Sequence, residues 1–126
     1  MTGFEAKIIE SSKELAAKER IALKDTTTAK KLDLETSAGD VVIDVDGYVV
    51  LGIHNEKAED KDYENYVILA KNGERYVTGS KSFWSTFKGM YEEMALANEL
   101  DNFSIRCTRV ESKNYKGKQF ITCQII

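Results

Sequence analysis

The sequence predicts an all-β protein with one or two helices, built as one small barrel. Three features predict this fold. Apolar and polar residues alternate strictly from Val41, the pair Asn72–Gly73 marks a tight hairpin, and a helix-period stripe interrupts the strands after Gly79. A chain of 126 residues has the length of one domain, and its 42% hydrophobic and 31% charged residues are typical of a globular protein.

The alternation between Val41 and His54 predicts an unusually long strand with one buried face. Two glycines, Gly47 and Gly52, are positions where this strand can bend sharply, as the first strand of a small barrel must. The alternate, more polar residues of this strand are expected to face solvent. They include Asp44, Asp46, Tyr48 and His54.

Four further strands are expected at 63–70, 75–78, 103–110 and 118–126, with an acidic loop at 56–62 and a hairpin tip at 112–117. A helix is expected from Ser80 to about Leu100, capped by Ser80 or Ser82. Its stripe contains Phe83 and Trp84, which we assign to the core.

The first 40 residues are read as a helix and a connection that belong to the same domain. Ser11 and Glu14 have the spacing of a capping box, and a weak apolar stripe follows. The second segment, 41–126, carries the order of three strands, a helix and two strands. This is the order of the OB fold, a five-stranded barrel with a helix between the third and fourth strands. The alternative is an α+β sheet with one helix laid over it.

No catalytic constellation is present. The single histidine, His54, lacks a metal-ligand or nucleophile motif around it, and Asp44 and Asp46 are better explained as a solvated strand face than as a cation site. We therefore expect a protein that is not an enzyme and that binds no cofactor or metal. Cys107 and Cys123 are read as small buried hydrophobes, with a cross-strand disulfide as the alternative.

Neither a membrane-spanning run nor a secretory signal is found, so a cytoplasmic protein is expected. The net charge of −3 is unfavourable for a nucleic-acid binder, but the charge is segregated. Segment 54–64 has five acidic residues against two lysines, whereas 106–118 has five cationic residues against one acidic residue.

Aromatic residues alternate with cations near the C-terminus, a pattern typical of proteins that hold a flexible single strand. Bases stack on aromatic rings at about 1–3 kcal/mol each, and nearby cations follow the phosphates. The predicted binding residues are Tyr48, His54, Arg75, Arg106, Lys113, Tyr115, Lys116, Lys118 and Phe120.

Two stretches resemble the small single-stranded DNA-binding proteins of phages that infect Gram-positive bacteria. They are residues 75–84, RYVTGSKSFW, and residues 111–118, ESKNYKGK. The resemblance implies an OB barrel that binds single-stranded DNA during replication in the bacterial host cytoplasm, with the barrel face and the last hairpin as the binding surface.

Replication proteins are the other partners that the resemblance implies. Cellular bacterial relatives recruit them with a flexible acidic tail, whereas this chain ends Cys123–Gln124–Ile125–Ile126 within a predicted strand, so recruitment by that route is not expected. A non-catalytic module that binds protein or a small ligand is the alternative function, because a fold alone does not fix function. A hydrolase with an unrecognised site is a third class. The sequence does not indicate an oligomeric state.

Overall fold

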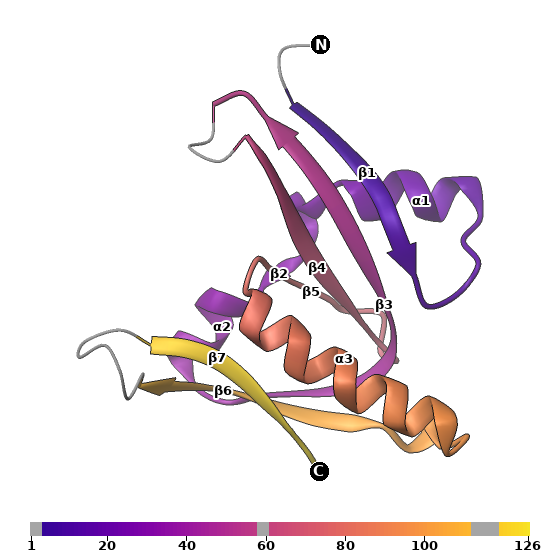
Figure 1. Cartoon of the computed structure of the whole chain (residues 1–126), viewed down its shortest axis with the longest axis vertical. Coiled ribbons are helices and arrows are strands. Elements are labelled where there is room, and N and C mark those ends of the chain that lie inside the picture. The colour runs from indigo at the N-terminus through magenta and orange to yellow at the C-terminus, as the bar shows by residue number, and fades with distance from the viewer. Residues whose placement is uncertain (1–3, 58–60, 112–118) are drawn as a thin grey trace.

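A computed structural model describes residues 4–57, 61–111 and 119–126 of the chain (Figure 1). In these residues, seven strands form one curled sheet: β1 (Phe4–Ser11), β2 (Lys30–Lys31), β3 (Val41–Asn55), β4 (Asp62–Ala70), β5 (Arg75–Thr78), β6 (Ser104–Glu111) and β7 (Gln119–Ile125). The same residues contain the α-helices α1 (Ala17–Lys24), α2 (Leu32–Ala38) and α3 (Lys81–Leu96), and the 3₁₀ turns η1 (Thr26–Thr28) and η2 (Leu100–Asn102).

The long strand β3 organises the sheet, whose order is β2-β5-β4-β3-β6-β7. Strand β4 pairs with one edge of β3 in antiparallel register. The other edge is shared, because β6 pairs with its first residues, Val41–Asp44, and β1 pairs with its last residues, from Val49 to Asn55. One strand thus belongs to both halves of a curled sheet.

The expectation of an all-β, closed five-stranded barrel is wrong. A closed barrel leaves no free edge, but here the outer edge of β5 pairs in parallel with β2, and β7 pairs only with β6 among the described strands. The sheet therefore stays open as a mixed half-barrel, and the protein is of the mixed α/β type. The N-terminal segment causes the difference, since β2 occupies the edge of β5 and α2 follows it directly, with Leu32 fully buried in the core.

From Val41 onward, the strands follow the predicted ranges to within one residue at each end, whereas helix α3 ends at Leu96 rather than near Leu100. The hairpin between β4 and β5 turns at Gly73, whose φ of +91° favours glycine. Helix α3 begins after Ser80, whose hydroxyl accepts a hydrogen bond from the Phe83 N–H at 3.2 Å. Before Val41 the structure contains β1, which was not predicted, and the predicted helix start at Ser11 lies in that strand. Helix α1 begins instead at Ala17, where the Glu19 carboxylate accepts a hydrogen bond from the Ala16 N–H at 3.2 Å.

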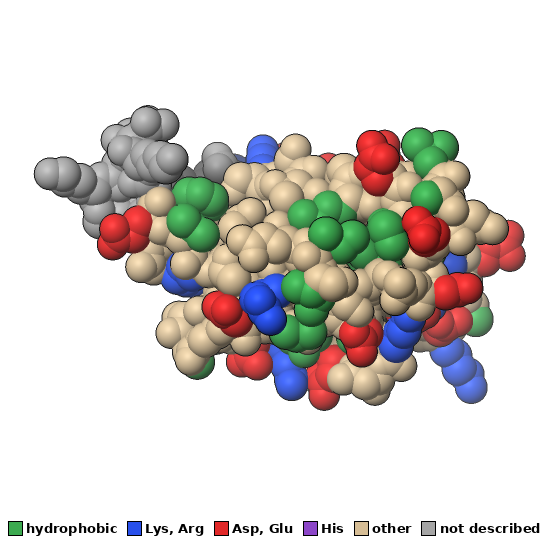
Figure 2. Space-filling view, turned by 90° about the horizontal axis from the view of Figure 1, so that it is seen from below, with side chains coloured by type: hydrophobic (Ala, Val, Ile, Leu, Met, Phe, Trp, Pro, Cys, Tyr) green, Lys and Arg blue, Asp and Glu red, His purple; other side chains and the backbone are tan. Residues whose placement is uncertain are grey.

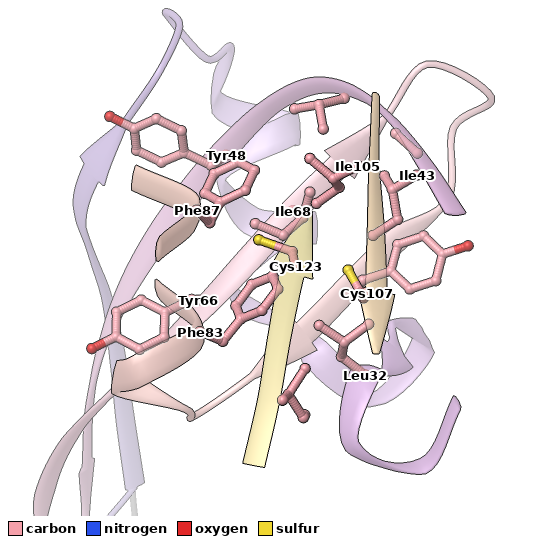
Figure 3. Packing of buried hydrophobic residues seen from close by; sticks show 14 of the residues in the cluster. Leu32, Ile43, Tyr48, Tyr66, Ile68, Phe83, Phe87, Ile105, Cys107 and Cys123 are labelled. Atoms are coloured by element: carbon pink, nitrogen blue, oxygen red, sulfur yellow. The ribbon is translucent and has the colours of Figure 1, made fainter. Parts of the chain in front are cut away.

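Two apolar clusters lie on opposite faces of the sheet. The larger one packs α3 against the concave face, with Phe83 and Phe87 fully buried in it (Figure 3). Trp84 is partly buried against the same cluster. The smaller one packs Leu23 of α1 against Val49, Leu51 and neighbouring side chains of the convex face. Strand β3 is consequently buried on both faces from Gly47 to Leu51.

A β-bulge explains how β3 serves both clusters. Val45 pairs with Ala70 and Gly47 pairs with Leu69, so one extra residue, Asp46, is inserted into β3. The insertion changes parity: Ile43 and Val45 before the bulge share the larger cluster with even-numbered residues after it.

The helices leave two sheet surfaces uncovered. One is the outer face of β6–β7, and the other is the concave side of β1, β3 and β4 beyond the start of α3. Among the described residues, no helix is long and apolar enough to cross a membrane.

Candidate nucleic-acid interface

The outer face of β6–β7 is a regular two-stranded surface. Antiparallel pairing sets Arg106 opposite Gln124, Thr108 opposite Thr122, and Val110 opposite Phe120. The alternate residues Ile105, Cys107, Ile121 and Cys123 point inward and are buried. The period of two therefore separates a core face from a solvent face that carries one cation, several hydrogen-bonding groups and one aromatic ring.

Phe120 and Arg106 lie on this solvent face as predicted. Phe120 is 41% exposed although aromatic side chains are usually buried, and Val110 opposite it is 40% exposed. Arg106 is exposed, and it has no ion-pair partner among the described residues. Asp44, the carboxylate nearest in register, accepts a hydrogen bond from the Ser104 hydroxyl at 2.6 Å.

Four predicted residues, Lys113, Tyr115, Lys116 and Lys118, lie outside the described part of the chain. The structure therefore places Arg106 and Phe120 on one surface and does not describe the other members of the predicted hairpin set.

Tyr48 is not on the surface, which corrects the prediction of a solvent-facing side chain. The bulge turns it into the core, where it is 5% exposed and packs edge-on against Trp84, with ring centroids 5.1 Å apart. Its hydroxyl donates to Glu10 at 2.5 Å, and the Lys88 ammonium lies 5.0 Å from its ring centroid. Burial, and then the Glu10 carboxylate, raise the pKa of this phenol.

Arg75 holds the N-terminal segment rather than presenting a free cation. Its guanidinium donates to the carbonyl of Ala22 at 2.9 Å and to the Thr28 hydroxyl at 2.5 Å. These bonds join β5 to the end of α1 and to η1. The positive side chain satisfies a carbonyl at a helix C-terminus, where a cation is favourable.

His54 is engaged by carboxylates on both ring nitrogens. Nδ1 lies 2.7 Å from Asp62 and Nε2 lies 2.6 Å from Glu56. The hydrogen bond with Asp62, and then that with Glu56, raise the pKa of the imidazole. Because both ring nitrogens are hydrogen-bonded to carboxylates, His54 is better explained as a link between β3, β4 and Glu56 than as a contact for a phosphate.

The second uncovered surface is a groove of about 550 Å³ on the concave side of the sheet. Gly52 lies in its lining beside Ile9, which is 58% exposed. The charges around it have both signs, since Glu5, Asp62 and Glu64 accompany Lys7, Lys81 and His54. A groove with this balance has no excess of positive charge for a polyanion.

The surface at the end of the molecule that carries the C-terminus also has charges of both signs. Hydrophobic side chains reach the surface between scattered residues of both charges (Figure 2). The described residues contain no group of three or more His, Cys, Asp or Glu side chains that could hold a metal ion.

The sequence analysis overlooked cations on α1. Lys18, Arg20 and Lys24 are all exposed, and they flank Ile21, which is 71% exposed. The signal that could have indicated them is the presence of three cations within seven residues, 18–24.

The chain matches no protein-family model, no curated protein and no solved structure.

Proposed function

We propose that this chain binds single-stranded DNA, largely without regard to sequence, through the outer face of β6–β7. The observation that carries the proposal is that Phe120 and Arg106 are both exposed on the outer face of β6–β7, four residues apart in register, and that Arg106 has no ion-pair partner among the described residues. An aromatic ring and a cation on one uncovered face are what stacking and phosphate contact require.

The neighbouring side chains suit a strand with freely rotating bases. Thr108 and Thr122 lie between the ring and the cation, and Gln124 lies opposite Arg106. All three offer hydrogen-bond donors and acceptors, and none of them is charged. Contacts of this kind tolerate any base, because every base has a face to stack and the phosphate is constant.

The biological role rests on the resemblance of residues 75–84 and 111–118 to phage single-stranded DNA-binding proteins. It supports protection of single strands during phage DNA replication in the bacterial cytoplasm, without catalysis. The binding surface itself depends on the β6–β7 strand pair and not on closure of a barrel.

A titration of the full chain with fluorescently labelled oligo-dT, oligo-rU and a duplex of equal length tests the proposal. We expect oligo-dT to bind much more tightly than duplex, whose bases are not free to stack. The logarithm of affinity should fall with the logarithm of salt at a slope of about −0.7 per neutralised phosphate. No binding at low salt, or equal binding of duplex, would contradict the proposal.

A second candidate, binding of a peptide or a small polar ligand, is favoured by the mixed-charge groove beside Gly52. Amide chemical shifts measured during the oligo-dT titration separate the two surfaces. Changes at Thr108, Phe120 and Thr122 support the proposed face. Changes confined to Lys7, Gly52 and His54 would place the strand in the groove.

A further inference from the structure

Helix α1 carries a cationic surface that the proposed face does not include. Three of its eight residues, Lys18, Arg20 and Lys24, are cationic and exposed, and none has an ion-pair partner among the described residues. Its one acidic residue, Glu19, accepts a hydrogen bond from the Ala16 N–H at 3.2 Å and so caps the helix. In a chain of net charge −3, this is a local excess of positive charge.

The geometry of the helix gathers these groups on its solvent side. At about 100° per residue, Ile21 lies nearly opposite Leu23, and Lys18 and Lys24 lie three residues to either side of Ile21. Leu23 is buried in the smaller apolar cluster, which fixes the orientation of the helix. Ile21, 71% exposed, is therefore the centre of a small apolar spot bordered by cations.

The helix is held in place from outside. The Arg75 guanidinium donates to the Ala22 carbonyl at 2.9 Å and ties the last turn of α1 to β5. The cationic side chains are thus mounted on an anchored helix, and a partner that binds them need not order them first.

We infer that the surface formed by Lys18, Arg20, Ile21 and Lys24 is a second contact for single-stranded nucleic acid, with the cations on phosphates and Ile21 against a base or sugar. The inference rests on the proposed function and extends the path of the bound strand along the convex side of the sheet, on which both α1 and the outer face of β6–β7 lie. A polyanion is the occupant that the charge selects. A membrane is disfavoured as the partner, because a helix that binds at a membrane interface needs a broad exposed apolar face. The apolar side of α1 that carries Leu23 is buried against the sheet.

The test compares two triple variants that remove equal charge. In the first, Lys18, Arg20 and Lys24 are each replaced by Gln, which preserves helix propensity. In the control, Lys7, Lys57 and Lys61, all exposed, are each replaced by Gln. With oligo-dT, the α1 triple variant should bind at least about tenfold more weakly at low salt, and its salt slope should fall by about two units. The control should show a clearly smaller change in both.

An Ile21→Cys variant carrying an environment-sensitive dye reports the contact directly. Its emission should change on addition of oligo-dT, whereas a dye at Leu96→Cys, on the exposed end of α3, should not respond. If the wild type binds oligo-dT but the two triple variants are equivalent and the dye at position 21 is silent, the inference is overturned while the proposed function stands. If the wild type does not bind oligo-dT, both fall. A dye response to vesicles containing anionic lipid and not to oligo-dT would assign the surface to a membrane and also overturn the inference.

Discussion

The hydroxyl of Tyr48 donates a hydrogen bond across 2.5 Å to the carboxylate of Glu10, joining the buried centre of β3 to the N-terminal strand β1. Lys88 of α3 donates to the same carboxylate oxygen. The Lys88 hydrogen bond first, and then that from Tyr48, lower the pKa of Glu10. Three elements that are distant in sequence thus meet at one carboxylate.

Replacing Tyr48 by Phe should lower the free energy of unfolding by about 1–2 kcal/mol, because the ring still fills its site while a bond to a charged group is lost. Urea denaturation measures the change. Tyr63→Phe is the control, since the Tyr63 hydroxyl makes no hydrogen bond within the described residues, and its effect should be near zero. Equal effects of the two substitutions would show that the bond to Glu10 contributes nothing.

The same contact shows why local sequence patterns did not give the position of Tyr48. Strict alternation predicts that Tyr48 shares a face with Asp44, and this would hold if β3 were regular. The bulge at Asp46 exchanges the faces, and it depends on pairing with β4, which local alternation does not specify. The elements themselves were predictable from Val41 onward because their signals are local, such as the Asn72–Gly73 turn and the Ser80 cap.

The open form of the sheet was not predictable from the sequence, for a similar reason. Only two residues, Lys30 and Lys31, pair with β5, and two lysines carry no strand signal. On the candidate interface, Phe120 and Arg106 were predictable because β6 and β7 are regular. The role of Arg75 was not, since its partners, Ala22 and Thr28, lie about fifty residues earlier.

Helix α3 should be the main contributor to core stability. Phe87 is fully buried and contacts the rings of Tyr48, Trp84 and Phe103. Phe87→Ala should therefore lower the free energy of unfolding by about 3–5 kcal/mol, measured by chemical denaturation. Leu96→Ala, at a position 86% exposed on the same helix, should change it by less than about 0.5 kcal/mol. A loss too small to measure for Phe87→Ala would mean that α3 does not pack on the sheet as described.

Stability should decrease as pH rises through the titration of His54. Its pKa is raised in the folded state by the hydrogen bond with Asp62 and then by that with Glu56, so the folded protein holds the proton more tightly. The stabilisation is complete below the unfolded pKa of about 6.5 and is lost as pH rises through the folded value.

Thermal unfolding recorded between about pH 5 and about pH 9 tests this, and His54 is the only histidine in the chain. In His54→Gln the midpoint should depend less on pH across this interval. A wild-type unfolding midpoint that rises with pH through the same interval would contradict the stabilising role of the hydrogen bonds from His54 to Asp62 and Glu56.

Cys107 and Cys123 should remain unreactive in the folded protein although they face each other across β6 and β7. Both are free and buried, and burial raises the pKa of Cys107 to about 12 and that of Cys123 to about 11. Because the thiolate is the reactive form, a thiol reagent at pH 8 should react very slowly with the native chain. The two thiols should react at once in guanidinium chloride. Rapid labelling under native conditions would show that β7 opens readily.

The two residues of the proposed face should fail in different ways. Phe120→Ala should weaken binding of oligo-dT by about 1–3 kcal/mol at every salt concentration, because stacking is not screened by ions. Arg106→Ala should weaken binding more at low salt than at high salt and should reduce the salt slope by about 0.7, the value of one phosphate contact. Both side chains are exposed, so both variants should keep the wild-type melting temperature.

The control for Phe120 is Ile125→Ala, because Ile125 is 52% exposed and its side chain lies on the other face of β7. The control for Arg106 is Lys57→Ala. Losses as large in the controls as in the paired variants would place the bound strand on another surface.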